Sequence, residues 1–346
     1  MFDIITIGGA TQDIFVETDR GKIFNLETVS SKESYLCFDY GAKIEMDKMA
    51  YDIGGGAANT AVNFANLGLN TGIIVKIGND LTAKAIMQRF KEKNIDTSMV
   101  IESKEDKTGF SIILTSYEGD RTVLMHRGAN STIKESEINF EKINHSKWLY
   151  VASLSGDSNQ VLDKLAEYAE NNGVNMAINP GSTQLKGGID CMKKILKKAE
   201  ILVLNRDEAS AVTGIPNNPP EFPSACDDNL KEMIVKLRNY CPNTVVITEG
   251  KRGAYAFNGE TFYHCPTFPS KVVSTLGAGD AFASTFVAGM IKYEKNNIEK
   301  SLKIASINSA HVVQSFGAQS GLKNFEELEK IYEENKDFNV VVLPMC

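Results

Sequence analysis

The 346-residue chain is long enough for one large domain or two smaller ones, and its 42% hydrophobic and 23% charged residues are ordinary for a globular protein. Its formal net charge of −7 argues against nucleic acid as the main partner, because a polyanion favours a basic protein surface. The N-terminal stretch lacks the basic region of a signal peptide and no apolar run approaches the length of a membrane helix, so we expect a cytoplasmic protein without a membrane partner.

Short runs rich in β-branched and aliphatic residues alternate with helical patterns along most of the chain. Strands are predicted over residues 3–8, 71–78, 147–152, 174–179, 200–205 and 244–250. Helices between and after them are predicted near residues 58–65, 81–93, 158–172, 186–198, 228–239 and 298–315. This alternation is typical of βαβ units, so we expect an α/β fold with a mainly parallel central sheet.

Two regions interrupt the alternation and are expected to lie outside the main sheet. Residues 14–52 are long, mixed in composition and partly strand-like. Residues 108–127 indicate a hairpin that turns at Glu118, Gly119 and Asp120. We therefore expect residues 1–346 to form a single domain, with a small β lid contributed by residues near 14–52 and 108–127.

The first glycine-rich stretch, DIGGGAANTAVNFANLG at 52–68, opens a predicted helix. It lacks the G-x-G-x-x-G spacing of a dinucleotide site and follows an irregular segment, which argues against an oxidoreductase. It also lacks the lysine of a G-x-x-x-x-G-K-[ST] phosphate loop. The glycines permit a ligand to approach the backbone closely, and the Asn59 amide can both donate and accept hydrogen bonds. This combination suits a polyhydroxylated ligand.

The second glycine-rich stretch, STLGAGDAFASTFVAGM at 274–290, places an acid at a predicted helix start. Gly277 and Gly279 predict a tight turn, and the apolar spacing indicates a helix from Ala278 onward. Backbone N–H groups at a helix N-terminus favour an anion, so Asp280 would stand beside an anion cradle and would be kept ionised by the helix dipole. The structural alternative is an ordinary turn followed by a helix cap.

The two glycine-rich stretches together resemble the two signatures of the ribokinase family, also called the PfkB carbohydrate kinases. The resemblance covers almost the whole chain and keeps the family's order of motifs. The further segments that carry it are GGATQDIFV at 8–16, IGND at 77–80, GDRTVLMHRGAN at 119–130, NRDEA at 205–209, TEGKRGAYAF at 248–257 and INSAHVVQSFGAQSG at 307–321. It implies a three-layer α/β/α fold and a kinase that uses ATP and Mg²⁺.

The same resemblance implies roles for individual positions. The catalytic base is Asp280, and its anion hole is formed by Gly277, Ala278 and Gly279. Hydroxyl groups of the phosphoryl acceptor are held by Asp13, Gly55, Asn59 and Asn130. The nucleotide side is formed by Asn205, Thr248, Gly250, Gly253 and Asn308. The acid of the N-x-x-E motif that organises Mg²⁺ and phosphate is Glu208.

These positions predict an ATP-dependent kinase that phosphorylates a hydroxyl of a small sugar. A nucleoside kinase of the same family is the alternative within the enzyme class, and the candidates to hold its base are Phe15, Phe38, Tyr40 and Phe110. A nucleotide or sugar sensor without catalysis is the alternative from another class. If they point inward together, three cationic side chains would suit an anionic acceptor such as a sugar phosphate: Lys43, Arg121 and Arg127.

Two further expectations concern ions and partners. Ser274 stands where many family members carry an aspartate that helps to form a monovalent-cation site. A hydroxyl is a weaker ligand than a carboxylate for a hard cation, which argues against K⁺ activation. Family members often pair their lids, so the resemblance also implies a homodimer through the lid.

Overall fold

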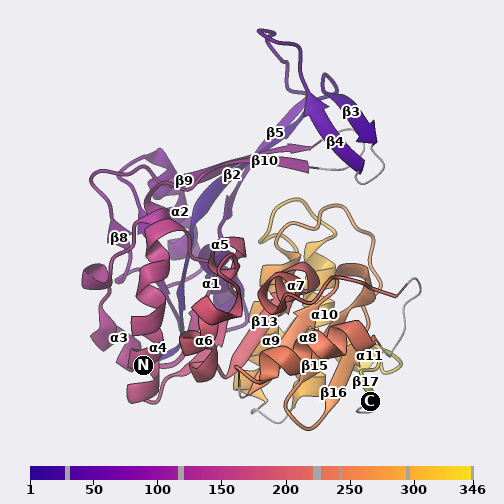
Figure 1. The fold of residues 1–346 in the computed structure, drawn as a ribbon. Coiled ribbons are helices and arrows are strands. Elements are labelled where there is room, and N and C mark those ends of the chain that lie inside the picture. Colours follow the sequence, from indigo (N-terminus) through magenta and orange to yellow (C-terminus); the bar gives the residue numbers. More distant parts are fainter. Residues whose placement is uncertain (28–31, 116–120, 221–226, 242, 294–296, 344–346) are drawn as a thin grey trace.

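The computed structural model describes residues 1–27, 32–115, 121–220, 227–241, 243–293 and 297–343 (Figure 1). Within them, one large sheet has the strand order β17-β16-β15-β14-β13-β12-β11-β1-β6. Its parallel part consists of β6 (Thr71–Ile74), β1 (Phe2–Ile7), β11 (Ser146–Val151), β12 (Asn175–Ile178), β13 (Ile201–Asn205) and β14 (Thr244–Thr248). The antiparallel edge consists of β15 (Ala254–Phe257), β16 (Phe262–Cys265) and β17 (Val341–Leu343).

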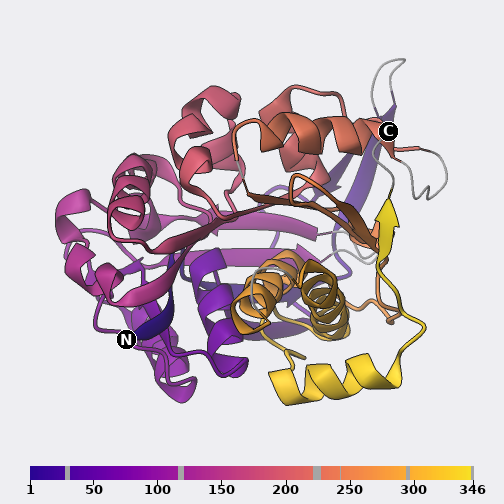
Figure 2. The ribbon, with the colours of Figure 1, turned by 90° about the horizontal axis from the view of Figure 1, so that it is seen from below.

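Helices cover both faces of this sheet, as the view along it shows (Figure 2). One face packs against α1 (Gly56–Asn66), α2 (Leu81–Glu92), α9 (Ala278–Lys292), α10 (Ile298–Val312) and α11 (Phe325–Glu334). The other packs against α3 (Phe140–Asn144), α4 (Leu162–Asn171), α5 (Ser182–Leu185), α6 (Gly188–Lys198), α7 (Arg206–Thr213) and α8 (Asp228–Arg238). The fold is therefore a three-layer α/β/α sandwich, as predicted.

Alternating residues of the parallel strands pack into two separate hydrophobic cores, one on each face of the sheet. Because both faces are buried, the strand sequences are mainly apolar. In β11, Trp148 and Tyr150 lie in the core beneath α1 and α9, whereas Leu149 and Val151 lie in the core beneath α4 and α6. A strand buried on both faces loses the polar alternation of a half-exposed strand. The continuous apolar runs of the sequence thus correspond to the parallel strands.

The six predicted strands are all present, one strand is divided in two, and one predicted helix begins differently. The run at 71–78 is divided into β6 and β7 (Lys76–Ile77), and β7 pairs with β8 (Ile101–Glu102) in a separate small sheet. The predicted helix at 158–172 begins as a 3₁₀ turn before α4. No helix within the described ranges is long and apolar enough to cross a lipid bilayer.

A second sheet stands over one edge of the sandwich (Figure 1). Its strands are β10 (Arg121–His126), β9 (Gly109–Thr115), β2 (Thr11–Glu17) and β5 (Lys48–Gly54), and we call them the lid sheet. A separate hairpin of β3 (Lys22–Glu27) and β4 (Lys32–Cys37) projects beyond it. Strands β9 and β10 pair as the predicted hairpin does, while its turn at Glu118, Gly119 and Asp120 lies outside the described residues.

A buried polar cluster joins α1, α9 and α10. The Asn63 amide donates to the hydroxyls of Ser284 and Thr285, at 2.8 Å each. The Asn308 amide donates to Thr285 Oγ1 at 2.8 Å and to Asn63 Oδ1 at 3.1 Å. All four side chains are fully buried, so each depends on the others to satisfy its hydrogen-bonding groups. The cluster therefore fixes the position of α9 against its neighbours.

We expect Asn63→Ala to lower the free energy of unfolding by about 2–3 kcal/mol, because buried polar groups on two neighbouring helices lose their hydrogen-bond partner. Urea unfolding measures the change. The control is Asn171→Ala at the exposed end of α4, which should change the unfolding free energy by less than about 0.5 kcal/mol. Equal effects of the two substitutions would contradict this account of the cluster.

Candidate active site

The predicted site residues gather where the parallel strands end. The carboxyl ends of β1, β13 and β14 lie along one edge of the central sheet, and the chain passes from β1 directly into β2 of the lid sheet. Asn205 and Thr248 are register partners at the ends of β13 and β14. Ligands of open α/β sheets bind outside this edge, so the topology alone places a site beneath the lid sheet.

The N-terminus of α9 points into this region and carries the predicted base. Gly277 adopts a left-handed conformation, with φ of 77°, and a Cβ there would lie 2.5 Å from the backbone of Ala318. Only glycine fits both constraints, and the turn sets the helix to begin at Ala278. The N–H groups of Gly279 and Asp280 have no intrahelical acceptor in the first turn, so they can hold an anion.

Asp280 is half-buried and is held by a residue from the first glycine-rich stretch. The Asn59 Nδ2 group donates to Asp280 Oδ2 at 2.8 Å. Burial raises the pKa of Asp280 to about 6, the charge of Asp13 adds to the rise, and the hydrogen bond from Asn59 opposes it. The sequence predicts that the helix dipole keeps this carboxyl ionised, and burial acts in the opposite direction by raising its pKa. A carboxyl with this pKa is still mostly ionised at pH 7.

Asp13 reaches the same space from the lid sheet. It is buried, its Oδ1 accepts a hydrogen bond from Thr11 Oγ1 at 3.0 Å, and burial raises its pKa. Gly55 precedes α1 with φ of 93°, and a Cβ there would lie 2.5 Å from the carbonyl oxygen of Gly9. The absence of a side chain lets the first glycine-rich stretch pack against the turn that leads to Asp13. The structure thus brings Asp13, Gly55, Asn59 and Asp280 together.

Asn130 lies beside this group, and its amide is already engaged. Its Nδ2 donates to the Ala10 carbonyl at 2.8 Å, and its Oδ1 accepts from the Ala10 N–H at 3.0 Å. The side chain is buried. Asn130 therefore holds the turn between β1 and β2, which in turn positions Asp13.

The predicted N-x-x-E pair forms a reciprocal cap at the start of α7. Asn205 Oδ1 accepts from the Glu208 N–H, and Glu208 Oε2 accepts from the Asn205 N–H, both at 2.8 Å. Burial raises the pKa of Glu208, and the charges of Asp280 and Asp207 add to the rise. The charge of Asp280 thus reaches Glu208 at the start of α7.

The loop after β14 carries Thr248, Gly250 and Gly253, and a residue outside the predicted set anchors it. Arg206, which is buried, donates to Glu249 Oε1 at 2.8 Å and also pairs with Asp227. This contact ties the start of α7 to the loop. Arg206 stands inside the quoted NRDEA stretch, but arginine at a helix start carries no sequence signal for a buried ion pair.

Asn308, predicted on the nucleotide side, is hydrogen-bonded within the protein. It is fully buried, its Nδ2 serves the α1–α9–α10 cluster, and its Oδ1 accepts from the Lys323 N–H at 2.9 Å. With both ends of its amide used inside the protein, Asn308 acts in packing the helices.

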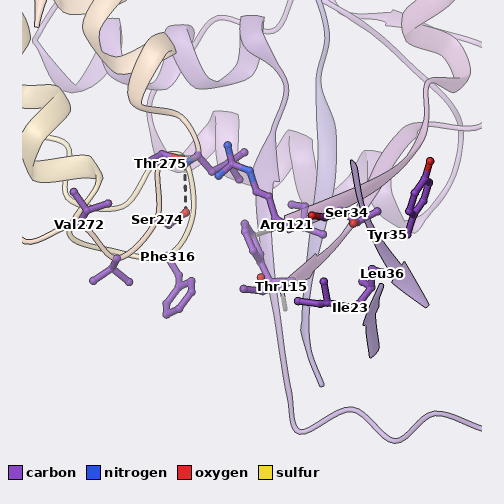
Figure 3. A pocket seen from close by; sticks show the side chains of 15 residues that line it. Ile23, Ser34, Tyr35, Leu36, Thr115, Arg121, Val272, Ser274, Thr275 and Phe316 are labelled. Atoms are coloured by element: carbon purple, nitrogen blue, oxygen red, sulfur yellow. Dashed lines mark hydrogen bonds between the residues drawn. The ribbon is translucent and has the colours of Figure 1, made fainter. Parts of the chain in front are cut away.

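A cavity of about 540 Å³ lies between the lid sheet, the β3–β4 hairpin and the 272–276 segment before α9 (Figure 3). Phe15 and Ile113 line it from the lid sheet, two residues along the strands from the pair Asp13 and Ser111. Arg121 pairs with Thr115, two residues further along, and its side chain reaches toward Ser274 and Thr275 (Figure 3). Arg127 and Lys43 do not line this cavity, so only one of the three predicted cations does.

The residues present fit both groups that an ATP-dependent kinase requires. The first turn of α9 offers N–H donors for a phosphate, since a helix N-terminus attracts anions. Asp13, Asp280 and Glu208 have no cationic side chain paired with them among the described residues. Among the described residues no group of three or more His, Cys, Asp or Glu side chains could hold a metal ion alone, so Glu208 is the carboxylate that could contribute to an Mg²⁺ bound together with phosphate.

Comparisons with known proteins agree with this geometry. The sequence profile described as pfkB family carbohydrate kinase matches residues 26–324. A ribokinase of Staphylococcus aureus is 28% identical over 84% of this chain and 92% of its own length. An ATP-dependent 6-phosphofructokinase of Thermoanaerobacterium thermosaccharolyticum is 26% identical over 86% of this chain and 90% of its own. The Arabidopsis thaliana ribokinase structure with ribose and ATP superposes with a TM-score of 0.77 at 21% identity, covering 95% of this chain and 98% of that one.

The fold and these matches define a phosphotransferase of the sugar-kinase class. The chain belongs to the PfkB family of carbohydrate kinases. The resemblance seen in the sequence is therefore confirmed at the level of family and fold.

The raised pKa of Asp280 predicts a pH-dependent effect of Asp280→Asn on stability. A carboxyl whose folded pKa of about 6 exceeds its ordinary 3.8 destabilises the fold fully above pH 6, and the penalty disappears as the pH falls from 6 through 3.8. The variant should therefore be more stable than wild type by about 1–2 kcal/mol at pH 7.5, and by clearly less at pH 4.5. Thermal melts at the two pH values measure this, and a gain independent of pH would contradict the assignment.

Proposed function

We propose that this protein is an ATP-dependent kinase that phosphorylates a hydroxyl group of a small sugar, with Asp280 as the general base. The observation that carries the proposal is the position of Asp280. It stands in the first turn of α9, beside N–H groups suited to a phosphate, and it is held by Asn59 while facing Asp13. One carboxylate thus addresses both an anion site and a site for hydroxyl groups.

The proposed reaction divides the work between the two sides of the site. Asp13 and Asn59 orient the acceptor, and Asp280 accepts the proton of its hydroxyl as the oxygen bonds to the γ-phosphorus and ADP departs. The N–H groups of Gly279 and Asp280 stabilise charge on the transferring group. Mg²⁺, when bound near Glu208, would neutralise the nucleotide phosphates. A base with pKa near 6 is ionised and still basic enough to take a proton at neutral pH.

The cavity beneath the lid sheet favours an acceptor with an anionic group. Asp13 lies outside its lining but on the same strand as Phe15, which lines it, and the row of Arg121 follows about 13 Å from Asp13 along the strands. A guanidinium matches a phosphate or carboxylate through paired hydrogen bonds. We therefore place the reacting hydroxyl near Asp280 and an anionic end near Arg121, and propose that the lid sheet covers the bound acceptor.

Aromatic residues in the same cavity support a nucleoside as the second candidate acceptor. Phe15, Tyr35 and Phe316 line it, and such rings can stack against a base. Of the four aromatic residues predicted for this role, Phe15 alone lines the cavity, whereas Tyr40 is fully exposed.

Two proposals concern ions and assembly. Ser274 Oγ accepts a hydrogen bond from the Leu276 N–H at 3.3 Å. This contact supports a role for the hydroxyl in ordering the turn before α9. It also supports an enzyme that does not require K⁺. A homodimer through the lid is supported by the large apolar side chains that the lid sheet and the hairpin expose, among them Phe24, Leu26, Met49, Tyr51, Leu124 and Met125.

ADP release from ATP–Mg²⁺ tests the proposed function directly. The acceptors are ribose, fructose, fructose 6-phosphate, a deoxy-keto sugar acid, adenosine, guanosine and cytidine. We expect one class to stimulate ADP release, and Asp280→Asn to lower the stimulated rate by a factor on the order of 10² to 10⁴ while ATP still raises the melting temperature. ATP binding without stimulation by any acceptor would favour the sensor, and full activity of Asp280→Asn would remove it from the mechanism.

Arg121→Met tests the anionic end of the acceptor. We expect it to raise KM for a phosphorylated or acidic sugar by about tenfold or more, because a charge-assisted contact is lost, and to leave a neutral sugar within about twofold. The matched control is Arg127→Met, which removes an exposed arginine that does not line the cavity. An equal effect on charged and neutral acceptors would assign Arg121 to the fold of the lid sheet.

A further inference from the structure

A chain of hydrogen bonds leads from the base to the lid sheet. Asn59 donates to Asp280 at 2.8 Å, and Gln319 Nε2 donates to Asn59 Oδ1 at 3.2 Å. Arg89, on α2, donates through one guanidinium nitrogen to Gln319 Oε1 at 2.5 Å and through the other to Asp52 Oδ1 of β5 at 3.1 Å. One continuous chain of hydrogen bonds thus connects α9, α1, the segment after α10, α2 and β5.

The chemistry of these groups gives the chain a single direction. An amide presents a donor at one end and an acceptor at the other, whereas a guanidinium only donates. Because Arg89 can only donate, the oxygen of Gln319 must face it, and the Nε2 group then faces Asn59. Asn59 receives that donor on its oxygen and is left with its own Nδ2 group toward Asp280. The orientation of the Asn59 amide is thus determined by Arg89, which acts through Gln319.

We propose that Gln319 and Arg89 are positioning residues that hold the donor end of the Asn59 amide on the base Asp280. The proposal rests on the proposed role of Asp280. Neither residue touches the reacting groups, since both act through Asn59.

The orientation of the Asn59 amide matters because the side chains of this chain are largely buried. Asn59 is 7% exposed and Gln319 is 9% exposed, so water cannot readily replace a lost partner. Arg89 is partly buried and its second contact anchors it to Asp52, whose side chain is 15% exposed. Without Gln319, the Asn59 amide can turn its oxygen toward the carboxylate, which exchanges an attraction for a repulsion.

The charged and titratable groups around Asp280 determine whether loss of the oriented amide raises or lowers its pKa. Asp13 from β2, Glu208 from α7 and Tyr150 from β11 interact with it, and a negative charge on any of them favours its protonated form. Asn59 from α1 is the group that stabilises its ionised form. Loss of the oriented amide must therefore raise the pKa of Asp280.

The test is a carbon-13 NMR titration of the full-length protein labelled at the aspartate carboxyl carbons, which needs no acceptor. The Asp280 signal is the one absent from Asp280→Asn, and its midpoint in the wild type should lie near 6. Gln319→Met should raise the midpoint by roughly half a pH unit or more, since a hydrogen bond to a charged group is lost. Gln88→Met is the control, because it removes an exposed amide beside Arg89 that bonds only to Glu92.

A double-mutant cycle separates action through Asn59 from other effects. In an Asn59→Ala background, Gln319→Met and Arg89→Met should no longer move the midpoint, because the amide that they orient is gone. Arg89→Lys keeps a donor-only cation and should lie nearer to the wild type than Arg89→Met. An unchanged midpoint in folded Gln319→Met, or an equal shift without Asn59, would overturn the proposal.

Turnover on the same variants keeps the two proposals distinguishable. Full activity of Asp280→Asn would reject Asp280 as the base even if the titration showed the expected shifts. Unchanged titration of Gln319→Met, with activity lost in Asp280→Asn, would reject the positioning chain and leave the base in place.

Discussion

The hydrogen bond between Asn59 and Asp280 is the contact on which the arrangement of the site depends. It joins residues 221 positions apart, from the first turns of two helices that begin at glycine-rich stretches. The helices can meet there only because α1 and α9 pack side by side, with Asn63, Ser284 and Thr285 satisfying one another in the buried interface. The lid sheet adds Asp13 to the same place through the short turn after β1. A base and a group for binding hydroxyls are thus set by packing that is remote from the ligand.

The electrostatics of the site follow from this packing. The charge of Asp13 raises the pKa of Asp280, and the charge of Asp280 raises that of Glu208. The neutral amide of Asn59 and the N-terminus of α9 favour the ionised form of Asp280 instead. Such a site is unfavourable when empty of cations and polar ligands, and it becomes favourable when hydroxyl groups, phosphate and a divalent ion are present. The cation Arg121 lies apart, at the far end of the cavity, where it can select the acceptor without neutralising the base.

Much of the fold could be predicted from the sequence because the parallel strands are buried on both faces and are therefore apolar throughout. The antiparallel strands β15 to β17 and helices α7 and α11 were missed, since short edge elements leave weaker patterns. The site residues that touch glycine-rich turns were found from local spacing and family resemblance. The packing contacts of Asn308 could not be predicted, because an asparagine that binds a ligand and one that joins helices look alike in sequence. Gln319, Arg89 and Arg206 act through side chains distant in sequence, and no local pattern indicates such contacts.

The pH dependence of kcat/KM for the acceptor tests the central claim, that the half-buried carboxyl at the start of α9 is the base. This parameter reports the ionisation of the free enzyme, whose Asp280 pKa is about 6. The account predicts that kcat/KM falls on the acid side with a midpoint near 6, and that the residual activity of Asp280→Asn lacks this limb. A wild-type profile that stays level down to pH 4.5 would contradict it.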